Sequence, residues 1–124
     1  MSSQNTIAII GSRHFSNIEY IAAVLAELQD TGVPFMIVTG CADGADAIAR
    51  MTCKSKNIPC HVFEADWHAY GKAAGPMRNA AIAEAAQGCY AFIDKPLKQC
   101  RGTLDCINQF TEAGKPVRIF VSLN

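Results

Sequence analysis

Short apolar runs alternate with helix-forming segments along the chain, and this alternation constrains the fold more than any other feature. Each run has four or five residues and is bounded by glycine, proline or polar residues. Runs of this kind are typical of strands buried on both faces. The five expected strands are residues 6–10, 35–38, 59–63, 89–93 and 117–121.

The intervening segments predict four helices. Asn17 and Asp43 can cap the first two, and apolar residues follow each of them at spacings of three and four. The third segment is rich in alanine, which favours helix. The expected helices lie between Asn17 and Gly32, from Asp43 to about Lys56, from Pro76 or Met77 to Gln87, and from near Gly102 to Ala113.

Strict alternation of strand and helix predicts a parallel sheet, because right-handed crossovers return each strand in the same direction. We therefore expect a three-layer Rossmann-like α/β fold with about five strands and helices on both faces. The length of 124 residues suits one domain over residues 1–124. Residues 64–76 show no sustained period and are expected to form a long, functional loop.

Composition limits the partners. Eleven basic and eleven acidic residues cancel, so no broad positive field favours nucleic acid or an anionic membrane. Neither is expected as a partner. No apolar stretch approaches the roughly 20 residues that span a bilayer, and residues 1–6 do not resemble a secretory signal, so we expect a cytoplasmic protein.

Six cysteines do not predict a metal site. They form no Cys-x-x-Cys pair and have no histidine at zinc-finger spacing. Such cysteines suit a reducing compartment. We expect no metal and no cofactor.

Ligands of this fold class bind at the carboxyl ends of the strands, and glycine-bearing polar loops occur there. After the first strand, Gly11 permits close approach, Ser12 offers a hydroxyl and Arg13 can grip a phosphate, with His14 nearby. The alternative is an ordinary turn with a solvated arginine. Neither a Gly-x-Gly-x-x-Gly fingerprint nor a Gly-Lys-Ser/Thr loop is present, which argues against a standard dinucleotide or P-loop site.

The loop after the second expected strand contains the candidates Thr39, Gly40, Asp43, Gly44 and Asp46. The glycines suit close backbone contact with a ligand. The aspartates could bind a ribose hydroxyl or the amides of the following helix, and capping is the favoured role of Asp43.

The segment from 66 to 79 supplies the remaining aromatic and basic candidates. Trp67 and Tyr70 could stack on a base, beside Lys72, Arg78 and Asn79. Trp67 could instead fill the core. The conjunction of aromatic and basic residues beside a helix start favours the binding role.

Four segments, in this order, resemble the YspA-like (DUF2493) group of the SLOG superfamily, whose relatives include the LOG phosphoribohydrolases and the DNA-processing protein DprA. They are IIGSRHFSN, IVTGCADGADAIAR, VFEADWHAYGKAAGPMRN and RGTLDCINQFTEAGKPV. The match covers nearly the whole chain. It implies a Rossmann-like fold that binds nucleotides or nucleotide-derived ligands, with genes found in bacteria and their phages.

The resemblance also implies site residues, and one departure. By motif the ligand would contact Gly11, Ser12, Arg13, Gly40, Asp43, Gly44, Asp46, Arg78, Asn79, Gly102 and Thr103. Arg101 is a further candidate because it lies in the loop that follows the fourth expected strand. The LOG enzymes have a Pro-Gly-Gly-x-Gly-Thr-x-x-Glu signature, and here Cys106 stands where its catalytic glutamate would be. Asp105, one residue earlier, should point about 100° away on the helix.

Three functions remain. The leading hypothesis is a sensor or sequestering protein that binds a nucleotide-derived phosphorylated small molecule. The second is a phosphoribohydrolase that cleaves a nucleoside 5′-monophosphate with the help of Arg78 and Asp105; the third is a single-stranded nucleic-acid module. Excess alanine in the third helix suggests packing across a two-fold axis, so a dimer or higher homo-oligomer is expected.

Overall fold

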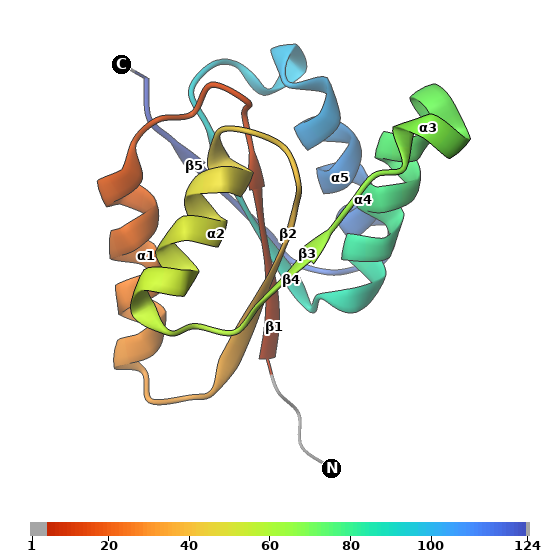
Figure 1. The fold of residues 1–124 in the computed structure, drawn as a ribbon. Helices are drawn as coiled ribbons and strands as arrows, with labels where there is room; N and C mark the ends of the chain where they lie inside the picture. The colour runs from red at the N-terminus through yellow and green to blue at the C-terminus, as the bar shows by residue number, and fades with distance from the viewer. Residues whose placement is uncertain (1–4, 124) are drawn as a thin grey trace.

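The computed structural model describes residues 5–123 and has one parallel five-stranded sheet in the order β3-β2-β1-β4-β5 (Figure 1). The strands are β1 Asn5–Gly11, β2 Phe35–Gly40, β3 Cys60–Phe63, β4 Gly88–Ile93 and β5 Val117–Val121. This confirms the Rossmann-like α/β fold. The order reverses at β1, so the crevice at the carboxyl end of β1 is where this class binds ligands.

Helices cover both faces of the sheet, as Figure 1 shows. Helices α1 (Ile18–Asp30) and α2 (Ala45–Lys56) lie on one face, and α4 (Ala74–Ala85) and α5 (Arg101–Glu112) lie on the other. Alternate residues of β1 serve the two layers: Ile9 packs with α1 and α2, whereas Ala8 and Ile10 pack with α4 and α5. Within the described residues, no helix is long and apolar enough to cross a membrane.

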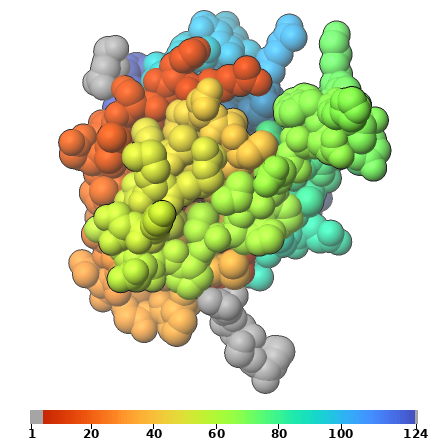
Figure 2. All heavy atoms as spheres, viewed as in Figure 1, coloured from red at the N-terminus to blue at the C-terminus, as the bar shows by residue number. Residues whose placement is uncertain are grey.

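The prediction of an irregular loop over residues 64–76 is wrong. Asp66 accepts a hydrogen bond from the Ala69 amide at 3.0 Å and starts a one-turn helix, α3 (Trp67–Tyr70). A 3₁₀ turn, η1 (Gly71–Ala73), continues directly into α4, which begins two or three residues earlier than expected. In Figure 2 this segment forms a lobe at the edge of the molecule.

The predicted cap at Asp43 is also wrong. Gly44 is the N-cap of α2, with φ of 71° and no side-chain cap bond. A β carbon at Gly44 would overlap the backbone of Ser12 and Arg13, and the Ala45 amide donates to the Ser12 carbonyl at 3.2 Å. The conformation of Gly44 therefore fits the start of α2 against the loop after β1.

Smaller differences concern the last third of the chain. The expected polar loop 94–99 contains a 3₁₀ turn, η2 (Leu97–Gln99), whereas α5 begins at Arg101, close to the expected start near Gly102. Gly11 is required by packing, because a β carbon there would overlap the Phe92 carbonyl oxygen of β4.

Candidate functional site

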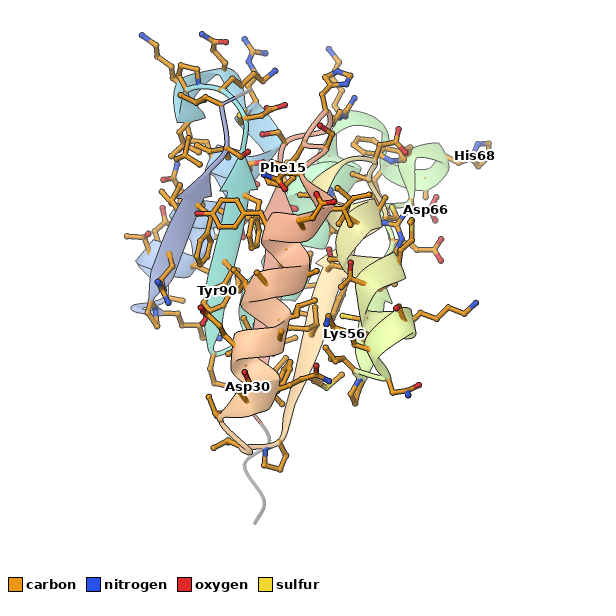
Figure 3. All side chains as sticks on the ribbon, turned by 90° about the vertical axis from the view of Figure 1, so that its left-hand side faces the viewer. Phe15, Asp30, Lys56, Asp66, His68 and Tyr90 are labelled. Atoms are coloured by element: carbon orange, nitrogen blue, oxygen red, sulfur yellow. The ribbon has the colours of Figure 1, made fainter. Side chains whose placement is uncertain are left out.

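A cavity of about 800 Å³ opens at the carboxyl edge of the sheet. The loops after β1 and β2 and the first turns of α2, α4 and α5 surround it. Five basic and three acidic side chains line it, so the local charge is positive although the chain is neutral. They are Arg13, Lys72, Arg78, Lys95 and Arg101, and Asp43, Asp46 and Asp105. Figure 3 shows many nitrogen-tipped side chains along the corresponding edge.

The N-terminus of α5 faces this cavity without a side-chain cap. Cys100 precedes the helix and makes no cap bond, and the first turn contains no acidic residue. The Leu104 amide donates to the Cys100 carbonyl at 2.8 Å, which leaves the amides of Arg101, Gly102 and Thr103 without a helical acceptor. Such a terminus has a positive dipole end and suits an anion.

The loop after β1 is held in place by Ser12. Its amide donates to the Phe92 carbonyl at 3.0 Å, and its hydroxyl accepts from the Asp94 amide at 3.2 Å and lies 3.6 Å from the Cys100 sulfur. Ser12 is therefore buried and already bonded, whereas Arg13 is exposed at the cavity.

Asp46, in the first turn of α2, is 5% exposed yet lines the cavity. Its Oδ2 accepts a long bond of 3.4 Å from the Ala42 amide. Burial raises the pKa of Asp46 to about 6, against the lowering effects of Arg78, that amide and Arg50. Arg50 also donates to the carbonyls of Gly40 and Ala42 at 3.0 Å each, and so fixes the loop after β2.

A chain of hydrogen bonds connects α4 with α5. Arg78 Nε donates to Asn79 Oδ1 at 2.9 Å, and Asn79 Nδ2 donates to the Gly102 carbonyl at 3.2 Å and to Asp105 Oδ2 at 3.0 Å. Gln109 donates to the same Asp105 oxygen at 3.0 Å. Asn79 thus orients the Arg78 guanidinium and ties it to the start of α5.

Cys106, which stands where the LOG signature has its catalytic glutamate, has an uncharged side chain. Cys106 is 1% exposed, and burial raises the pKa of its thiol to about 12. Asp105 nevertheless lines the cavity beside it, because the first turns of α5 pack against α4. The prediction that Asp105 points away from the site is therefore wrong.

Most of the predicted site residues lie around one cavity. Those that line it are Gly11, Ser12, Arg13, Asp43, Asp46, Trp67, Lys72, Arg78, Asn79, Arg101, Gly102, Thr103 and Asp105. Four do not: Thr39, Gly40, Gly44 and Tyr70. Thr39 is fully buried and its hydroxyl donates to the Ile9 carbonyl at 2.6 Å, so it joins β2 to β1.

Several lining residues carried no signal in the sequence. Cys41, Gln99 and Cys100 belong to this group. Gln99 ends η2 and Cys100 follows it, and sequence patterns did not predict this turn. His14 does line the cavity, as expected, while Figure 3 shows His68 on α3 pointing away from the body of the fold.

Trp67 forms part of the cavity wall at α3. It is 51% exposed, and a β carbon on Gly75 would lie 3.1 Å from its ring. Gly75 therefore lets the indole lie close against the first turn of α4. Tyr70, 55% exposed on the same short helix, lies outside the cavity.

The sheet order and the cavity at its carboxyl edge define a Rossmann-like protein. A family model described as the YspA, cpYpsA-related SLOG family (YAcAr) matches residues 5–70. The chain is 35% identical over 118 residues to the Gene 61 protein of Mycobacterium phage D29, covering 90% of this chain and 92% of that protein. The chain belongs to the YspA, cpYpsA-related SLOG family.

A solved structure has the same fold. The X-ray structure of DNA processing protein A (DprA) from Streptococcus pneumoniae is similar with a TM-score of 0.76 and 20% identity, over 94% of this chain. The chain spans 50% of the length of that structure. Family membership points to a function related to nucleotides or nucleic acids. The expectation that nucleic acid is not a partner therefore has no support.

Proposed function

We propose that the cavity binds a phosphorylated nucleotide or nucleotide derivative, and that the protein acts as a sensor or a sequestering protein. The uncapped N-terminus of α5 carries this proposal, since its free amides open into a cavity lined by five basic side chains. The phosphate would lie at Arg101–Thr103 beside Arg13. The base would stack on Trp67, whose face is half-exposed at the other wall.

Binding without cleavage is favoured by Cys106. A neutral thiol cannot stabilise an oxocarbenium-like centre as a carboxylate does. The presence of Asp105 in the cavity supports phosphoribohydrolase activity as the second candidate. Its Oδ2 already accepts from Asn79 and Gln109, which favours an orienting role over a chemical one.

Mass spectrometry of small molecules released from the purified protein tests the proposal. We expect a nucleotide-derived phosphate compound in an amount near that of the protein. Incubation with the four nucleoside 5′-monophosphates should return each compound intact by liquid chromatography. Release of free base, abolished by Asp105→Asn, would establish the hydrolase instead.

Single-stranded nucleic acid is a third candidate, favoured by the exposed aromatic residues of α3 beside the basic cavity. A gel-shift experiment with a labelled single strand at low salt tests it, because phosphate contacts strengthen as salt falls. Retardation that competes with mononucleotide would make the cavity a nucleic-acid site. No retardation at low salt would remove this candidate.

A further inference from the structure

The two edges of the sheet differ in how they are protected. An unpaired edge strand invites pairing with another chain, and proteins commonly blunt such strands with short length, charges or proline. The edge strand β3 has four residues and lies between Pro59 and Glu64. The other edge strand, β5, is longer and apolar, with Ile119 45% and Val121 48% exposed. Figure 3 shows β5 at one side of the molecule with no helix outside it, so this edge is the less protected one.

The outer edge of β5 presents free backbone groups at alternate residues. At the start of the strand, the Cys89 amide donates to the Pro116 carbonyl at 3.0 Å. At its end, the Ser122 amide donates to the Ile93 carbonyl at 2.9 Å. In this parallel ladder the even-numbered residues of β5 therefore direct their backbone groups at β4. The amides and carbonyls of residues 117, 119 and 121 face outward, and within residues 5–123 they make no hydrogen bond.

The sequence of β5 is symmetric in chemical type about Ile119. It reads Val-Arg-Ile-Phe-Val, with a valine at each end and a cation and an aromatic ring on either side of the centre. Two copies of β5 that pair antiparallel about a two-fold axis at Ile119 bring Val117 against Val121 of the partner subunit. Arg118 then lies opposite Phe120 of the partner subunit. The strand is thus complementary to a second copy of itself, as an isologous interface requires.

One face of the paired strands would be apolar. Ile119 and Val121 lie on the same face of β5 as Val117, which packs with buried residues of α4 and α5. Both Ile119 and Val121 are about half-exposed in one subunit. Pairing places the same side chains of the second copy beside them, so an apolar strip crosses the axis and loses its contact with water.

The other face provides charge complementarity. The Arg118 guanidinium lies 5.1 Å from the centroid of the Phe120 ring and 5.7 Å from that of Tyr90 within its own subunit. In the antiparallel register, residues 118 and 120 form the pairs that exchange no backbone bonds, where side chains approach most closely. Arg118 therefore meets a further ring, that of Phe120 of the partner subunit, whose negative face attracts a cation.

We propose that β5 pairs antiparallel with β5 of a second copy, which gives a homodimer with one continuous sheet across a two-fold axis at Ile119. The outward amides and carbonyls of residues 117, 119 and 121 bond to those of the second copy. The expected homo-oligomer then has its contact on β5 and not on the alanine-rich α4. The inference does not depend on what the cavity binds.

Sedimentation velocity over a dilution series tests the dimer, which should dissociate on dilution. Ile119→Lys places two like charges at the axis and should raise the dissociation constant at least ~100-fold. The 45% exposure of Ile119 lets a lysine reach solvent in the separated subunit. Met51→Lys, at a 63% exposed position of α2, is the matched control and should leave the dissociation constant unchanged.

Amide hydrogen exchange followed by NMR tests the register. The Phe120 amide points at β4 and should exchange slowly in the wild-type protein and in Ile119→Lys. The Val121 amide faces outward, so it should be protected in the wild-type dimer and exchange rapidly in Ile119→Lys. If Ile119→Lys does not fold, exchange of the Ile119 and Val121 amides in the wild-type protein decides.

Three outcomes overturn the inference. The first is a wild-type protein that sediments as a monomer at every concentration. The second is a dimer that Ile119→Lys leaves intact and whose Val121 amide exchanges rapidly, because another surface, such as α4, then holds the two copies together. The third is an assembly that grows beyond the dimer, since pairing of β5 with β3 of the next copy does not close.

Discussion

Among the helix N-termini that border the cavity, those of α2 and α5 differ in what they offer a ligand. The first turn of α2 contains Asp46, and its Ala45 amide already donates to the Ser12 carbonyl. The first turn of α5 contains no acid, begins with Arg101 and has no side-chain cap. The same backbone arrangement therefore suits a neutral donor group at α2 and an anion at α5.

The largest effect should follow from making α5 resemble α2. Gly102→Asp introduces a carboxylate where an added β carbon meets nothing within 4 Å, so the fold tolerates it. The new charge should repel phosphate and weaken nucleoside monophosphate binding by about 3 kcal/mol, or roughly 100-fold. Calorimetric Kd values measure this. Gly102→Asn is the matched control, and equal Kd values for the two variants would remove phosphate from α5.

Removing the acid from α2 should stabilise the fold. Because burial raises the pKa of Asp46 from 3.8 to about 6, the ionised group costs stability once the pH exceeds that range. Asp46→Asn should thus gain about 2–3 kcal/mol at pH 8, and the gain should shrink as the pH falls from 6 towards 3.8. Urea unfolding at several pH values measures it. A gain independent of pH would show that Asp46 ionisation is not its source.

Single contacts at the phosphate end should contribute less. Arg13→Ala and Thr103→Ala each remove one polar group from the α5 side of the cavity, and each should weaken nucleotide binding by about 1–2 kcal/mol. The thermal shift at fixed nucleotide concentration reports the loss. Lys54→Ala, at an exposed position near the end of α2, is the control. Unchanged shifts in both variants would contradict the assigned phosphate position.

The smallest effect concerns the aromatic wall, which belongs to neither helix terminus. Trp67→Leu should weaken binding by about 0.5–1 kcal/mol, because its ring is half-exposed, whereas Tyr70→Leu should not. Trp67 is the single tryptophan, so ligand binding should also change the intrinsic fluorescence. Equal losses in the two variants would place the base elsewhere.

The fold could be predicted from the sequence because each strand reads as a short apolar run, and the three central strands β1, β2 and β4 are largely buried. The start of α2 shows the limit of such patterns. Asp43 is a favourable cap type, but Gly44 takes that position because only a residue without a side chain fits against Ser12 and Arg13. That contact joins segments more than 30 residues apart and has no local signal.

The candidate site was predictable in outline for a related reason. Polar residues directly after parallel strands must meet at one edge, which brings Arg13, Asp46 and Arg101 around the same cavity. Side-chain direction was not predictable. Asp105 lines the cavity because α5 packs on α4 through Asn79, and α3 exists because Asp66 caps a single turn too short to show a period.

The central position of β1 has a consequence for how the protein folds. The Thr6 amide bonds to the Gln87 side chain, 81 residues further along the chain, at the point where β4 joins β1. Most of the chain must therefore be synthesised before the second edge of β1 is paired. Sheets closed by such distant contacts fold slowly. Nascent chains that end before β4 should expose an unpaired strand edge and depend on chaperones to avoid aggregation.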